Sequence, residues 1–137
     1  MLTEDEVIDA VVSYLEERHW EIVSRCTAVQ RGDDLVAQRD GERLVVEAKG
    51  AGSSKPGTAR YGMSFSSGQA FDHVAKAILK GLRVASEHED RPAVALPDDR
   101  NHRRWVEPVT PALVQVGITV FWVAEDRTVK VEGPWRA

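Results

Sequence analysis

Three charged residues of the sequence stand where two short strands would bring them together. Asp34 begins one apolar segment, and Glu47 and Lys49 alternate with apolar residues at the end of a second one. Asp40-Gly41 between the segments is a strong β-hairpin signal, which predicts two antiparallel strands. Because side chains alternate across a strand, Glu47 and Lys49 point to the same face, and a suitable register brings Asp34 beside Glu47. The pattern predicts a divalent-metal site of two carboxylates with an ammonium group beside it.

The same alternation has a simpler interpretation. Charged residues between apolar ones are typical of the solvated face of an antiparallel strand, and a Glu-x-Lys pair alone is a short motif. Two neighbouring features favour the metal site. The Asp34 carboxylate precedes the hairpin, and a segment rich in Gly and Ser starts at Gly50, directly after Lys49.

These residues resemble the core motif of the restriction-endonuclease-like nuclease superfamily, written PD-(D/E)XK. The Asp of that motif corresponds to Asp34, and its E-x-K corresponds to Glu47 and Lys49. Asp33 stands where the motif usually has a Pro, which many members lack. The resemblance implies a restriction-endonuclease-like α/β/α sandwich with a central mixed β-sheet, and a nuclease that uses Mg²⁺ or Mn²⁺ to hydrolyse phosphodiester bonds in DNA. Its metal ligands would be the Asp34 and Glu47 carboxylates and the Ala48 carbonyl.

A carboxylate near the N-terminus is a further candidate for the metal site. Residues 3–18 are predicted to form an amphipathic helix that starts with a capping box, Thr3-x-x-Glu6. Glu4 and Leu15 are eleven residues apart, which places Glu4 on the core-facing side of this helix. One interpretation is that Glu4 favours the positive end of the helix and stays in solvent. In the resembled superfamily, a glutamate of the first helix reaches the metal site.

Further residues are candidates for completing the site or binding DNA. Gln69 stands at the start of a predicted helix over residues 67–86, where some families of the superfamily carry a Gln near the metal. The segment 50–68 leaves the site as a long loop, and such loops are usually functional or disordered. The segment 99–105 mixes basic residues with Trp105, which is typical either of a nucleic-acid contact or of a polar helix anchored by that Trp. The candidate nucleic-acid-binding residues are Lys55, Arg60, Tyr61, Arg103 and Arg104.

The predicted helix over residues 67–86 has an apolar face and a basic stripe. The spacing of its apolar residues predicts the face that is buried, and the basic stripe is interpreted as solvated. His73 is interpreted as a helix surface residue. The predicted buried face comprises Ala70, Phe71, Val74, Ala75, Ile78, Leu79 and Leu82, and the stripe comprises Lys76, Lys80 and Arg83.

The remaining segments predict an α/β architecture. The order is a helix, three strands, a helix, a strand, a helix, a strand and a small terminal strand, which favours a mixed central sheet flanked by helices. Apart from the elements given above, the predicted strands lie within residues 19–28 and over 93–98, 117–123 and 128–132, and a short helix covers 108–116.

Length and composition limit the class of protein. The chain has 137 residues, which suits a single domain over residues 1–137. It has no apolar run of membrane-spanning length, and its acidic N-terminus is unlike a secretory signal, so no membrane association is expected. Cys26 is the only cysteine, which excludes an intramolecular disulfide and a Cys-based zinc site and favours the cytoplasm. The net charge of −4 predicts weak DNA affinity that falls steeply with salt.

Three functional hypotheses follow from the sequence. The first is a Mg²⁺-dependent endonuclease that cuts DNA with Asp34, Glu47, Lys49, Glu4 and Gln69 in its catalytic site. Because Lys49 stands beside carboxylates, it is assigned to stabilise transition-state charge rather than to abstract a proton. The second is a catalytically inactive nucleic-acid-binding or accessory subunit of the same fold, and the third is a structural or dimerisation domain. Cleavage of both DNA strands by one small site would favour a homodimer.

Overall fold

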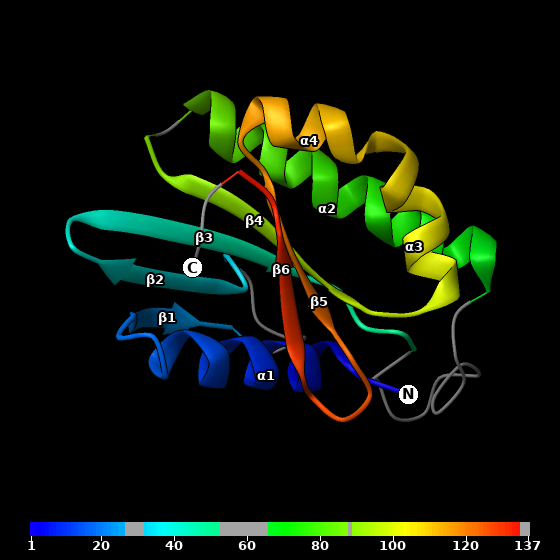
Figure 1. The fold of residues 1–137 in the computed structure, drawn as a ribbon, viewed down its shortest axis with the longest axis horizontal. Coiled ribbons are helices and arrows are strands. Elements are labelled where there is room, and N and C mark those ends of the chain that lie inside the picture. The colour runs from blue at the N-terminus through cyan, green and yellow to red at the C-terminus, as the bar shows by residue number, and fades with distance from the viewer. Residues whose placement is uncertain (27–31, 53–65, 88, 135–137) are drawn as a thin grey trace.

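A mixed sheet of six strands forms the centre of the protein in the computed structural model, which describes residues 1–26, 32–52, 66–87 and 89–134 (Figure 1). The strands are β1 (Glu21–Arg25), β2 (Leu35–Arg39), β3 (Glu42–Ala48), β4 (Arg91–Pro97), β5 (Thr119–Val123) and β6 (Val129–Glu132). They lie side by side in the order of the sequence. The central strands β3, β4 and β5 run parallel, and the other neighbouring pairs are antiparallel.

Helices cover both faces of this sheet (Figure 1). The helices are α1 (Glu4–Glu16), α2 (Ser67–Glu87), α3 (Arg100–Val106) and α4 (Thr110–Val116), with a 3-10 turn, η1 (Glu107–Val109), between the last two. Helix α1 lies on one face, and α2, α3 and α4 lie on the other. Parallel strands need long crossovers, and here α2 connects β3 to β4 while α3 and α4 connect β4 to β5. The mixed α/β class is confirmed, and so is the predicted order of elements, except that α3 and η1 precede the single helix predicted between β4 and β5.

The β2–β3 hairpin has a register that brings Asp34 opposite Glu47, the condition on which the predicted pair depends. Asp40 and Gly41 form its turn with positive φ angles of 52° and 79°, as a two-residue hairpin loop requires. Leu35 pairs with Val46, and both side chains pack against α1. The alternate side chains, represented by Val45, therefore face α2.

The predicted capping box starts helix α1. Thr3 Oγ1 accepts a hydrogen bond from Glu6 N–H, and the Glu6 carboxylate accepts one from Thr3 N–H. The helix ends at Glu16, two residues before the predicted end, because the chain turns through His19 at a positive φ of 67°. Trp20 is buried directly after this turn.

The packed face of α2 differs from the predicted face. Phe71 and Leu79 are 48% and 61% exposed, and Ala75 and Leu82 are exposed as well, so the prediction is wrong for these four residues. Small residues let the helix approach the sheet, since a Cβ atom at Gly81 would lie 3.3 Å from Ile118 Cδ1. The larger apolar residues are left on the outer side of the helix. The buried residues of α2 are Ala70, Val74, Ala77, Gly81 and Val84.

The segment 99–105 forms a polar helix anchored by Trp105, which is one of its two sequence interpretations. Asp99 caps α3 by accepting a hydrogen bond from His102 N–H. Trp105 Nε1 donates to Ser67 O at 2.8 Å, and its ring meets Phe71 edge-to-face. Helix α3 is thereby fixed to the start of α2. Within the described part of the chain, no helix is long and apolar enough to cross a membrane.

Candidate metal centre

Two carboxyl groups meet where β2 begins and β3 ends. Asp34 precedes β2, and the hairpin register places it opposite Glu47 on the face that α2 covers. Asp34 Oδ2 accepts a hydrogen bond from Ala48 N–H at 2.9 Å, and the Asp34 carboxyl group lies within hydrogen-bonding reach of Glu47. The sequence prediction of this pair is confirmed as a juxtaposition of side chains.

The pair lies at the carboxyl end of a parallel strand. Strand β3 pairs with β4 up to Ala48, and the ladder continues where Lys49 N–H donates to Ala95 O at 3.0 Å. Ligand sites of open α/β sheets commonly lie outside the carboxyl ends of their strands.

Two lysines pair with Glu47, whose side chain is only 12% exposed. Lys49 Nζ lies 3.5 Å from Glu47 Oε1, as the sequence predicts for this pair. Lys80 Nζ extends from α2 and lies 2.9 Å from Glu47 Oε2. Each carboxylate oxygen therefore has its own ammonium partner.

Lys80 is a residue of this site that the sequence analysis misses, because its position in the basic stripe is interpreted there as solvated. It stands three residues after Ala77 and four before Val84, and both of these are buried. Residues three and four apart share a helix face, so this spacing directs Lys80 towards the sheet. The sequence contains this spacing, but its use depends on recognising Ala77 and Gly81 as core positions.

Glu4 reaches the neighbourhood of this pair from the start of α1. The segment after Lys49 holds the helix terminus, because Ala51 N–H donates to Leu2 O at 2.7 Å. Burial raises the pKa of Glu4, while the Lys49 ammonium opposes this shift and the Glu47 carboxylate adds to it. These interactions favour the interpretation in which Glu4 faces the site.

Burial also dominates the electrostatics of Asp34. It raises the pKa of Asp34 to about 7, and the Glu47 and Glu4 carboxylates act in the same direction against the Ala48 N–H hydrogen bond. Two neighbouring carboxylates with little solvent favour sharing a proton or binding a cation. The pair is thus electrostatically prepared to accept positive charge.

His73 also lies near the site, although the sequence alone favours a surface position for it. It is half-buried on α2. Burial lowers the pKa of His73, and the Lys49 ammonium acts in the same direction. The imidazole therefore lies within electrostatic range of Lys49.

Gln69 has a local structural role. Its side chain accepts a hydrogen bond from Ser66 N–H at 2.8 Å, and Gln69 N–H donates to Ser66 Oγ at 3.2 Å. This reciprocal arrangement is a capping box at the start of α2. A role of Gln69 at a metal stays a prediction.

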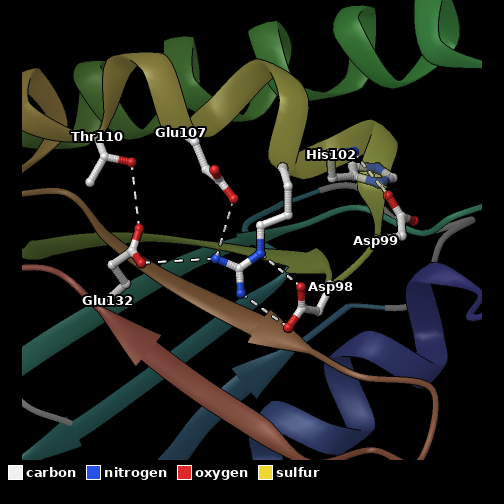
Figure 2. Close-up of polar contacts among 7 residues, drawn as sticks. Asp98, Asp99, His102, Glu107, Thr110 and Glu132 are labelled. Atoms are coloured by element: carbon white, nitrogen blue, oxygen red, sulfur yellow. Dashed lines mark hydrogen bonds and ion pairs between the residues drawn. The ribbon is translucent and has the colours of Figure 1, made fainter.

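The candidate DNA-binding arginines lie on α3 in different environments. Arg103 makes two hydrogen bonds to Asp98, and its guanidinium also faces Glu107 and Glu132 (Figure 2). Arg104 is exposed and donates to Ser67 Oγ at 3.1 Å. DNA binding by either residue stays a prediction, and the other candidates, Lys55, Arg60 and Tyr61, lie outside the described residues.

The donor set of Asp34 and Glu47 fits a hard divalent cation. Mg²⁺ typically keeps several waters and uses one or two carboxylates together with substrate phosphates. Across residues 1–26, 32–52, 66–87 and 89–134, no three His, Cys, Asp or Glu side chains come together as a metal site. The described residues therefore support a site in which the Asp34 and Glu47 carboxylates are the acidic protein ligands of the cation.

Comparison with protein-family models gives no match for this chain, and comparison with curated proteins gives none either.

Proposed function

We propose that the protein is a metal-dependent nuclease with a restriction-endonuclease-like fold, which hydrolyses phosphodiester bonds in DNA. The observation that carries the proposal is the contact between the Asp34 and Glu47 carboxyl groups beside the Lys49 ammonium. The mixed sheet with helices on both faces supports it, because that architecture agrees with the fold the motif implies.

Each residue of the site has a role in this proposal. Asp34 and Glu47 would hold Mg²⁺ or Mn²⁺ together with the Ala48 carbonyl, and Glu4 would act from α1. Such a metal, when bound, lowers the pKa of a water ligand and stabilises charge on the scissile phosphate. The Lys49 ammonium would donate hydrogen bonds to the phosphate oxygens and stabilise the negative charge of the transition state.

A second candidate is a non-cleaving nucleic-acid-binding or accessory subunit. The observation that favours it is the pairing of both Glu47 oxygens with lysine ammonium groups. These two positive charges neutralise the acidic pair without a metal ion. The net charge of −4 also favours weak binding to DNA. The two candidates differ in whether DNA is cut.

The role of Lys49 separates the two candidates. Lys49→Ala should abolish DNA cleavage in Mn²⁺ while leaving Mn²⁺ binding largely intact, because the lysine is no metal ligand. Lys76→Ala, which removes the same charge from an exposed position of α2, is the matched control and should cut normally. Loss of Mn²⁺ binding in Lys49→Ala would overturn the role assigned to this lysine. DNA binding without cleavage by the unmodified protein would select the accessory subunit.

A further inference from the structure

Glu47 binds a second lysine that the proposed mechanism does not use. Lys80 Nζ lies 2.9 Å from Glu47 Oε2, and Lys49 Nζ lies 3.5 Å from Oε1. A divalent cation that takes Glu47 as a ligand needs at least one of these oxygens. Cation binding and the full pairing of Glu47 with lysines therefore compete.

Of the two lysines that pair with Glu47, Lys80 can move away more easily than Lys49. Its side chain is 33% exposed, whereas that of Lys49 is 16% exposed. Two further acceptors already lie near its ammonium group, since its Nζ is 3.9 Å from Asp33 Oδ1 and 3.5 Å from Gly32 O. A small rotation of the lysine side chain can exchange Glu47 for these groups without leaving the ammonium unpaired.

Lys49 has less freedom to move away. Its backbone is held beside β4 by the hydrogen bond from Lys49 N–H to Ala95 O. The next residue, Gly50, packs against the start of α1. With this backbone fixed, the Lys49 ammonium can leave Glu47 only by rotation of a side chain that is less exposed than that of Lys80.

We propose that Lys80 is an internal counter-ion of the site, which a divalent cation displaces from Glu47 towards Asp33. This inference rests on the proposed function, because it concerns the cation that the Asp34–Glu47 pair would hold. The ammonium lowers the affinity for the cation by the difference in free energy between its contact with Glu47 and its contact with Asp33, since the cation and the ammonium cannot bind the same oxygen. Lys80 thus sets the metal concentration at which the site fills.

The first test compares Mn²⁺ affinity among three proteins, with free Mn²⁺ measured by electron paramagnetic resonance. Lys80→Met keeps the aliphatic stem and removes the charge, and it should bind Mn²⁺ about tenfold more tightly than the unmodified protein. Lys76→Met removes a charge one helical turn away on an exposed position and is the matched control. Its affinity should stay within about twofold of the unmodified protein, because exposed charges are screened by salt.

The second test follows the ammonium group itself in the unmodified protein. Reductive methylation with isotopic formaldehyde, read by mass spectrometry, reports how accessible each lysine is. Saturating Mg²⁺ should raise the labelling rate of Lys80 several-fold and leave that of Lys76 unchanged.

The outcomes separate this inference from the proposed function. Equal or weaker Mn²⁺ affinity of Lys80→Met, or Lys80 labelling that Mg²⁺ does not change, overturns the counter-ion role and leaves the metal site standing. Absence of Mn²⁺ binding by all three proteins overturns the proposed metal site, and the counter-ion role with it. Tighter Mn²⁺ binding by Lys80→Met, with no such change in Lys76→Met, supports the inference.

Discussion

Gly50 packs directly against the backbone of Glu4, so the residue after Lys49 fixes where α1 begins. A Cβ atom at Gly50 would lie 2.5 Å from Glu4 N and 2.8 Å from Thr3 C. The close approach joins the strand end that carries Lys49 to the helix that carries Glu4. The glycine is required here for space, because a side chain would overlap backbone atoms.

Gly50→Ala should therefore destabilise the protein and displace Glu4 from the site. Overlap with backbone atoms forces a shift, for which we expect a loss of about 1–3 kcal/mol in the free energy of unfolding. Urea unfolding of the variant and the unmodified protein measures this loss in the free energy of unfolding. Gly68→Ala is the matched control, since nothing lies within 4 Å of its Cβ position in α2, and it should raise stability by about 0.5–1 kcal/mol. Equal stability of Gly50→Ala and the unmodified protein would refute the close contact.

The pKa of Asp34 predicts how stability depends on pH without metal. Its native pKa of about 7 exceeds the ordinary value of 3.8, so the native state holds a proton that the unfolded chain releases between these values. The contribution of Asp34 to the free energy of unfolding should therefore fall as pH rises from about 4 to about 7, and then stay constant. Apparent Mn²⁺ affinity should rise over the upper part of this range, because protons compete for the same carboxylates.

Asp34→Asn tests this pH dependence at a single position. The amide can still accept from Ala48 N–H and donate to Glu47, but it carries no charge. At pH 8 without metal, the variant should be more stable than the unmodified protein by roughly 2 kcal/mol, a discounted value because the carboxylate keeps some solvent. Thermal unfolding at pH 8 and at pH 4 measures the difference, which should shrink at the lower pH. A less stable variant at pH 8 would contradict the cost assigned to the Asp34 charge.

Adjacent arginines of α3 should respond differently to the same substitution. Arg103 bridges α3 to Asp98 and stacks 4.1 Å over the Trp122 ring, so Arg103→Met should lower the free energy of unfolding by about 1–3 kcal/mol. Arg104 is exposed, and Arg104→Met should change stability by less than about 0.5 kcal/mol while weakening DNA binding. Urea unfolding and DNA titration at low salt distinguish the two effects. A stable Arg103→Met protein with reduced DNA affinity would reverse these assignments.

Local signals predicted the acidic pair well. The turn at Asp40-Gly41 predicts the hairpin and alternation along β3 gives the face of Glu47, so the sequence could bring Asp34 beside Glu47 on the condition of a suitable register. The start of α1 was equally predictable, because the capping box of Thr3 and Glu6 is a local interaction.

The tertiary packing of α2 was not predictable in the same way. Hydrophobicity favours burial of Phe71 and Leu79, but the sheet accepts the side of the helix that carries Ala77 and Gly81. Close approach of the helix decides this, and it depends on partners distant in sequence. The position of Lys80 follows from that packing, which is why the basic stripe concealed a site residue.

Cleavage of DNA by the unmodified protein tests the central claim most directly. A mixture of supercoiled plasmid, linear duplex and single-stranded DNA is incubated with Mg²⁺ or Mn²⁺, beside an Asp34→Asn, Glu47→Gln double variant. Glu16→Gln, at the opposite end of α1 from Glu4, is the matched control. The account predicts metal-dependent cutting by the unmodified protein and by Glu16→Gln, and none by the double variant. Equal cutting by the double variant, or no cutting by a protein that binds neither metal, would contradict it.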